Sequence, residues 1–177
     1  MFLARKVNSA KWLSENGIAK GEIPADAVSG DLKTGGNALS FWQCGAAARE
    51  IEDAALAIVT AAERIDKCEI AWIAEADVRS DQLAIAETLG KTPIGALALK
   101  HRDIISLDYN RLGKVARRLA DAIENGQYRL LRKKEVLGLL QAAIRKGLVR
   151  IDALSENIGK EIEKAMGSSQ ARNEEDV

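Results

Sequence analysis

Apolar and polar side chains alternate in short segments of the first half of the chain. Residues 38–44 (ALSFWQC) and 68–74 (CEIAWIA) show this alternation, and residues 2–7 (FLARKV) form a similar short run. Such runs are typical of half-buried strands. Between the second and third runs, residues 47–65 repeat apolar side chains every three or four positions, which predicts a helix. Strand, helix and strand together predict a crossover unit with parallel strands.

The second half of the chain predicts two amphipathic helices separated by a short turn. Over residues 108–125 the apolar side chains recur at helical spacing, Asp108 is a suitable N-cap, and Gly126 is a suitable stop. A second helix over residues 132–146 ends at Gly147. Two amphipathic helices with a short connection most simply form an antiparallel pair.

Further helices are predicted from capping residues and helix breakers. We expect helices over residues 80–89 and 94–105, and a last helix that begins at Asp152 and ends at Gly167. The last helix would cover the apolar seam between the two basic helices, because a pair of amphipathic helices alone leaves that seam exposed.

These elements predict the fold class α+β. We expect a small mixed β-sheet of about three strands with a crossover helix in the N-terminal half, followed by a C-terminal bundle of three to four helices. The chain then divides into a mixed α/β portion at residues 1–95 and a helical portion with a basic face at residues 96–166. Residues 167–177 are polar and acidic, and we expect a disordered tail there.

Charge is unevenly distributed along a chain that is neutral as a whole. The 26 basic residues balance 26 acidic ones, but residues 100–150 hold 13 Lys or Arg and only 5 Asp or Glu. The segments on either side are both net acidic. A neutral chain has no global electrostatic attraction to nucleic acid or to a membrane. Any attraction to a polyanion must therefore come from residues 100–150.

The sequence predicts a cytoplasmic location and no contact with a membrane. No secretory segment follows Met1, and no apolar run approaches the roughly 20 residues that a membrane-spanning helix needs. Cys44 and Cys68 form no CxxC motif, and we expect both to be small buried hydrophobic residues with reduced thiols.

No motif in the chain assigns a catalytic residue, a metal ligand or a cofactor. The tripeptide at residues 90–92 (GKT) resembles the end of a phosphate-binding loop, but Ile85 stands where that loop needs glycine. The single histidine, His101, lies between Lys100 and Arg102. We expect an exposed position for it, with protonation disfavoured by its two cationic neighbours.

A cluster of cations is the clearest functional signal. On the first basic helix the cations lie on one face at spacings of three and four, with one more adjacent. On the second they form three consecutive residues near the helix start, where the helix dipole disfavours each by roughly 0.3–1 kcal/mol. A local rule broken without compensation suggests function. The predicted binding residues are Arg111, Lys114, Arg117, Arg118, Arg132, Lys133 and Lys134.

We therefore predict a non-catalytic cytosolic binding protein whose basic C-terminal helices contact the phosphates of DNA or RNA. Such contacts supply affinity without reading base sequence. Tyr109 and Tyr128 flank the cluster and can stack on bases or pack in the core. One alternative is an interaction subunit or inhibitor that docks an acidic protein partner. A further alternative is a small enzyme with a site in the N-terminal loops that uses Arg5 or Lys6.

Overall fold

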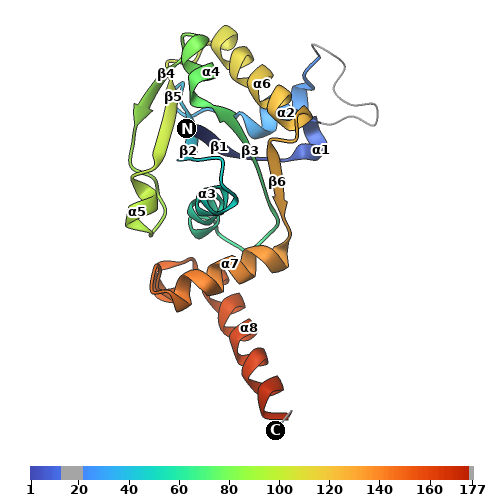
Figure 1. Ribbon diagram of the computed structural model, residues 1–177, viewed down its shortest axis with the longest axis vertical. Coiled ribbons are helices and arrows are strands. Elements are labelled where there is room, and N and C mark those ends of the chain that lie inside the picture. The colour runs from blue at the N-terminus through green and yellow to red at the C-terminus, as the bar shows by residue number, and fades with distance from the viewer. Residues whose placement is uncertain (13–21, 176–177) are drawn as a thin grey trace.

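The computed structural model describes residues 1–12 and 22–175, with side chains as far as Gly167 (Figure 1). The strands are β1 (Phe2–Val7), β2 (Leu39–Cys44), β3 (Cys68–Ala74), β4 (Ala84–Glu87), β5 (His101–Ile105) and β6 (Tyr128–Leu131). The helices are α1 (Ser9–Trp12), α2 (Ala25–Asp31), α3 (Ala48–Thr60), α4 (Glu75–Ser80), α5 (Gly95–Ala98), α6 (Tyr109–Glu124), α7 (Lys133–Arg145), the 3-10 helix η1 (Ile151–Ala153) and α8 (Glu156–Glu175). The six strands form one sheet in the order β4-β5-β2-β1-β3-β6, and all neighbouring strands are antiparallel.

The predicted arrangement of a small three-stranded sheet followed by a helical bundle is wrong. The structure is α+β, but its antiparallel sheet has six strands and its helices are spread through the chain. β2 and β3 run in the same direction and α3 connects them, but β1 lies between them, so the predicted parallel pairing does not form. Strands from both sides of the boundary predicted at residue 95 share this sheet, and the division into separate portions stays a prediction.

Two of the predicted helices are largely replaced by strands. Within residues 80–89 the structure has the strand β4, and within residues 94–105 it has the short helix α5 followed by β5. β5 pairs with β4 on one side and with β2 on the other, where Leu39 lies opposite Ile104. The helical spacing of these residues is overridden because backbone hydrogen bonds to neighbouring strands stabilise the extended conformation. Strand preference depends strongly on such context.

Apolar side chains project from both faces of the sheet, and helices cover each face. On one face α3 packs against Ala4, Trp42 and Ile70, and α7 and α8 extend this core through side chains such as Leu140. On the opposite face α6 packs together with α1, α2 and α4 over side chains such as Phe41. Successive side chains of a strand point to opposite faces, so the central strands serve both cores.

The two basic helices do not form the antiparallel pair that their sequence predicts. The segment between them contains β6, which pairs with β3 so that Leu131 lies opposite Cys68 and Tyr128 opposite Ala71. As a result α6 packs in the core on one face of the sheet, and α7 packs in the core on the other. Figure 1 shows α6 near one end of the molecule and α7 with α8 near the other.

The ends of these two helices confirm the predicted capping residues. The Asp108 carboxylate accepts a hydrogen bond from the backbone N–H of Arg111 at 2.8 Å, as an N-cap does. Gly126 and Gly147 follow the C-caps with φ angles of 73° and 68°. The N–H groups of each glycine and of the residue after it bond back to the last helical turn, which is the Schellman motif.

The last helix begins and ends at positions other than those predicted. Asp152 lies in η1, and the hydroxyl of Ser155 instead accepts from the backbone N–H of Ile158 at 3.4 Å at the start of α8. α8 continues past Gly167, where the sequence predicts its end. The last two residues lie outside the described part of the chain, and the predicted disorder of the tail stays a prediction.

Replacing Gly126 and Gly113 with alanine should change stability in opposite directions. Neither glycine has an atom of the described residues within 4 Å of an added Cβ, so backbone conformation decides the result. Gly126→Ala forces an L side chain into the left-handed region and should lower the free energy of unfolding by on the order of 1 kcal/mol. Gly113→Ala, inside α6, should raise it by about 0.5–1 kcal/mol. Urea denaturation measures both, and equal effects would contradict the assigned backbone geometry.

Candidate functional site

The structure divides the seven predicted binding residues into two groups on opposite sides of the sheet. Arg111, Lys114, Arg117 and Arg118 lie on α6, whereas the run at residues 132–134 lies at the start of α7. Because α6 and α7 pack in different cores, the two groups do not face one another. The single patch that the sequence predicts across both helices is therefore not formed.

Two cations of the α6 group hold the helix against α4. The Arg118 guanidinium binds the Asp81 carboxylate through Nε at 2.7 Å and Nη2 at 2.9 Å. Lys114 Nζ donates to the backbone carbonyl of Asp81 at 2.9 Å. Asp81 is the C-cap of α4, and its hydrogen bonds with Arg118 lower the pKa of its carboxyl group. Both cations thus have a structural role that their spacing along α6 does not reveal.

The other two cations of α6 are exposed. Arg111 donates through Nη1 to the backbone carbonyl of Ser106 at 2.7 Å. Arg117 forms no ion pair with any residue that the structure describes. Nearby, the Tyr109 side chain is 94% exposed, whereas Tyr128 is half-buried against the core beside α6. Of the two tyrosines, only Tyr109 presents a ring that a base could stack on.

The α7 group is exposed at the positive end of the helix. Arg132 is the N-cap, and Lys133 and Lys134 occupy the first turn. Lys133 Nζ lies 2.6 Å from Oε1 of Glu161 on α8, while the Glu135 carboxylate accepts the backbone N–H of Arg132 at 2.8 Å. Within the described residues, the side chains of Arg132 and Lys134 form no ion pair. The start of α7 therefore carries cations that are not directly neutralised.

Helix α8 adds two lysines to the same region. A groove of about 560 Å³ lies between α7 and α8, and Lys160 and Lys164 line it together with Glu161 and Leu137. Sequence reasoning missed these lysines, although their i, i+4 spacing on the predicted last helix places them on one face. The cationic surface at this end of the molecule thus includes both helices. We call this surface, made of Arg132, Lys133, Lys134, Lys160 and Lys164, the α7–α8 basic surface.

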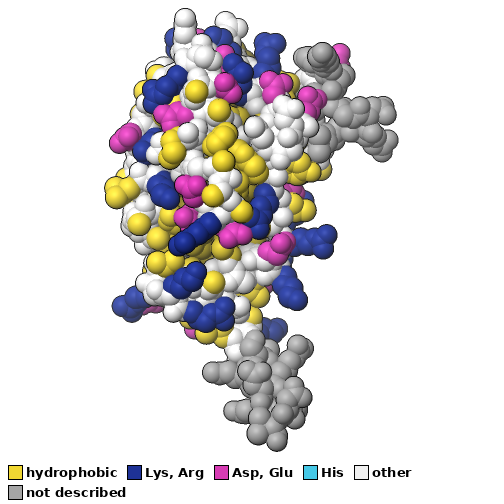
Figure 2. All heavy atoms as spheres, in the orientation of Figure 1, with side chains coloured by type: hydrophobic (Ala, Val, Ile, Leu, Met, Phe, Trp, Pro, Cys, Tyr) yellow, Lys and Arg dark blue, Asp and Glu magenta, His cyan; other side chains and the backbone are white. Residues whose placement is uncertain are grey.

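Acidic side chains interrupt the cations over the rest of the molecule. Figure 2 shows Lys and Arg side chains mixed with Asp and Glu side chains on the face in view. Arg129, which adds to the positive charge of residues 100–150, binds Glu52 at 2.8 Å, and Lys100 lies 3.8 Å from Asp53. The excess positive charge of that stretch is therefore not gathered into one basic face.

His101 lies in a polar cluster, and the predicted exposed position is wrong. Its ring packs edge-on against Trp42 at 4.9 Å, and Nδ1 lies 2.7 Å from the hydroxyl of Thr88. The same hydroxyl donates to Asp103 at 2.9 Å. Burial lowers the pKa of His101, and Arg102 adds a smaller effect in the same direction. Protonation is thus disfavoured as expected, but chiefly because the ring is partly buried.

The two cysteines are buried, which confirms the expectation from the sequence. Burial raises the pKa of both thiols to about 11, so they remain protonated near neutral pH. A protonated, inaccessible thiol is a poor nucleophile. Among the described residues, no three His, Cys, Asp or Glu side chains come together as a metal site would require.

Comparisons with known proteins supply no functional assignment: no family model, curated protein or solved structure gives a significant match to this chain. In the described part of the chain, no helix combines the length and the apolar character that crossing a membrane requires. The function is therefore inferred from the geometry and charge of this molecule.

Replacing Arg118 should destabilise the protein, whereas replacing its neighbour Arg117 should not. Arg118→Gln removes the two-point contact with Asp81 and should lower the free energy of unfolding by about 1 kcal/mol. Arg117→Gln makes the same change of charge without breaking a described contact, and should stay within about 0.5 kcal/mol of the wild type. The pKa of Asp81 is lowered, so the contact is lost as pH falls, and the effect of Arg118→Gln should shrink in acid. Equal destabilisation by both variants would contradict this role.

Proposed function

We propose that this chain is a non-catalytic binding protein that holds nucleic-acid phosphates on the α7–α8 basic surface. One observation carries the proposal: Arg132, Lys133 and Lys134 are consecutive, exposed and located at the positive end of α7. The helix dipole makes this an unfavourable place for three cations, and an anion bound there would relieve that cost. Phosphate is the anion that closely spaced Lys and Arg side chains bind in nucleic acids.

The contacts within the chain support a division of roles between the two groups of cations. Arg118 and Lys114 are engaged with α4, and a phosphate would have to compete with a two-point carboxylate contact there. On α7 only Lys133 has a carboxylate partner among the described residues, and such exposed contacts contribute roughly 0–1 kcal/mol. The group at the start of α7 is therefore the more available of the two.

A second candidate function is docking of an acidic protein partner. The carboxylates of Glu135, Glu156 and Glu161 lie on or beside the α7–α8 basic surface. These carboxylates repel the closely spaced phosphates of nucleic acid, whereas an acidic protein can place its carboxylates against the lysines and a few basic side chains against these glutamates. The mixture of charges is the observation that favours a protein partner, and a binding assay with purified nucleic acid separates the two candidates.

Binding of purified DNA and RNA should weaken steeply with salt if nucleic acid is the ligand. Between about 50 and 200 mM salt, the log–log slope of affinity should be roughly −0.9 for each phosphate neutralised on duplex DNA and roughly −0.7 on single strands. The triple variant Arg132→Gln, Lys133→Gln, Lys134→Gln should bind less tightly and flatten this slope by about 2 to 3. Its thermal unfolding should occur at the wild-type temperature or slightly higher, because all three side chains are exposed and their removal relieves the unfavourable interaction with the helix dipole.

The matched control removes the same charge from the other end of α7. Arg145→Gln, Lys146→Gln and Arg150→Gln change three exposed cations at or just after the end of α7, and Arg150, like Lys133 in the other variant, has a carboxylate partner, Asp152 at 2.6 Å. This triple variant should keep most of the wild-type affinity and slope. If the wild type retains neither DNA nor RNA at about 50 mM salt, nucleic-acid binding is wrong. If both triple variants lose affinity equally, the α7–α8 basic surface is not the site.

A further inference from the structure

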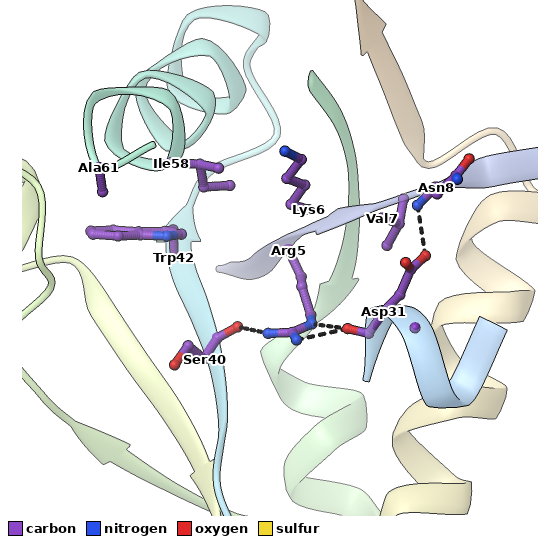
Figure 3. Close-up of a pocket in the computed structure, with 10 residues that line it drawn as sticks. Arg5, Lys6, Val7, Asn8, Asp31, Ser40, Trp42, Ile58 and Ala61 are labelled. Atoms are coloured by element: carbon purple, nitrogen blue, oxygen red, sulfur yellow. Dashed lines mark hydrogen bonds between the residues drawn. The ribbon is translucent and has the colours of Figure 1, made fainter. Parts of the chain in front are cut away.

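The sheet is incomplete between its two central strands. β1 and β2 pair only from Phe2 opposite Cys44 to Ala4 opposite Trp42. Beyond Ala4, β1 continues to pair with β3 as far as Val7, while β2 pairs with β5 on its other side. The facing edges of β1 and β2 therefore separate within the sheet, and Figure 3 shows the two strands diverging. Backbone groups along such a break need other partners, because buried N–H and C=O groups are rarely left without one.

The side chain of Arg5 occupies this break. Its Nη1 donates to the backbone carbonyl of Ser40 on β2 at 2.6 Å, and its Nε and Nη2 donate to the backbone carbonyl of Asp31 at 2.9 and 2.7 Å (Figure 3). The guanidinium also lies 5.6 Å from the centre of the Phe41 ring. Burial lowers the pKa of Arg5 to about 10, so the group remains charged at neutral pH.

A cleft of about 480 Å³ opens at the break. Lys6, Trp42, Ile58 and Ala61 line it on one side of β1, whereas Arg5 and Ser40 line it on the other (Figure 3). Ile58 of α3 and Ala61, the C-cap of that helix, lie beside the face of the Trp42 ring in Figure 3. The cleft thus has a cationic, hydrogen-bonding part and an apolar part, within the size range of small-molecule sites.

Within the part of the chain that the structure describes, no carboxylate contacts the Arg5 guanidinium directly. The Asp31 carboxylate instead accepts from the backbone N–H of Asn8 at 2.6 Å and from Trp12 Nε1 at 2.8 Å. The next carboxylate, Asp103, accepts from the hydroxyls of Ser40 and Thr88. Both carboxylates attract the guanidinium only through space.

The guanidinium also keeps unused hydrogen-bond donors. It has five N–H groups, and three of them take part in the bonds to Asp31 and Ser40. The other two have no acceptor among the residues that the structure describes. Lys6 adds a second, exposed cation that forms no ion pair with a described residue. Lys6 and Arg5 project from opposite sides of β1 (Figure 3), so an oxyanion in the break is attracted by a cation from each side, and guanidinium matches the geometry of carboxylate and phosphate.

We propose that the break between β1 and β2 is a binding site for a small organic oxyanion. Its carboxylate or phosphate group contacts the unused N–H groups of Arg5 in the break and is attracted by Lys6 from the other side of β1, and its apolar part packs against Trp42, Ile58 and Ala61 on the Lys6 side. This site is separate from the α7–α8 basic surface and does not depend on nucleic-acid binding. Arg5 holds the two strands together and at the same time presents its remaining N–H groups to the ligand.

Titrations of the full chain with inorganic phosphate, acetate and benzoate, followed by two-dimensional NMR at constant ionic strength, test the proposal. Phosphate or acetate should produce saturable shifts in residues that line the cleft, and sodium chloride should not. Whichever of these two binds more tightly identifies the preferred oxyanion. Benzoate should bind more tightly than acetate, because its ring can reach the apolar part of the cleft. Shifts that do not saturate, or that chloride reproduces, would overturn the site.

Variants assign the binding to the two cations. Lys6→Gln changes an exposed side chain and should weaken binding several-fold. Lys146→Gln, at the C-cap of α7, removes the same charge away from the cleft and should leave the affinity unchanged. Arg5→Lys keeps the charge but loses the planar donors, and should weaken binding by on the order of tenfold. If Arg5→Lys fails to fold, comparison of Lys6→Gln with Lys146→Gln still tests whether the oxyanion binds in the cleft. Equal affinity in both of these would refute the proposed contact.

Discussion

Burial of apolar side chains on both faces of one antiparallel sheet determines where the helices of this protein lie. Each central strand sends alternate side chains into two separate cores, so each face needs its own cover of helices. β6 carries the chain along the edge of the sheet between α6 and α7, which then pack on opposite faces. The separation of the basic residues is a direct consequence, because each cation follows the helix whose apolar side is buried.

Local patterns predicted those parts of the fold that depend on local physics. The sequence predicts the alternation in β2 and β3 and the apolar stripes of α3, α6 and α7, and the structure contains all of these elements. It also predicts the capping residues Asp108, Gly126 and Gly147. The short strands β4, β5 and β6 are not, because charged residues such as Arg102 and Asp103 leave them without a regular pattern. Those strands are held by hydrogen bonds to partners distant in the chain, and no local spacing encodes such a partner.

The candidate sites show the same division. The positions of Arg132, Lys133 and Lys134 at the start of a helix could be predicted, since a helix start is a local feature. The contact of Arg118 with Asp81 could not be predicted, because Asp81 is 37 residues away in the chain. The surroundings of Arg5 were equally hidden, because they depend on where β1 and β2 stop pairing and on the backbone of α2. A cationic side chain can therefore bind a ligand or stabilise the fold. Which of the two it does depends on whether a carboxylate or carbonyl from a distant part of the chain contacts it.

The short pairing of β1 with β2 also has a mechanical meaning. It divides the sheet into two half-sheets, β4-β5-β2 and β1-β3-β6, whose backbones are joined only along Phe2 to Ala4. Beyond that seam, the hydrogen bond from Arg5 to Ser40 and the packing of the helices keep the halves together. The molecule thus has a line along which it can hinge at lower cost than breaking a full ladder of backbone hydrogen bonds. Any molecule lodged there would couple its own binding to the stiffness of the whole sheet.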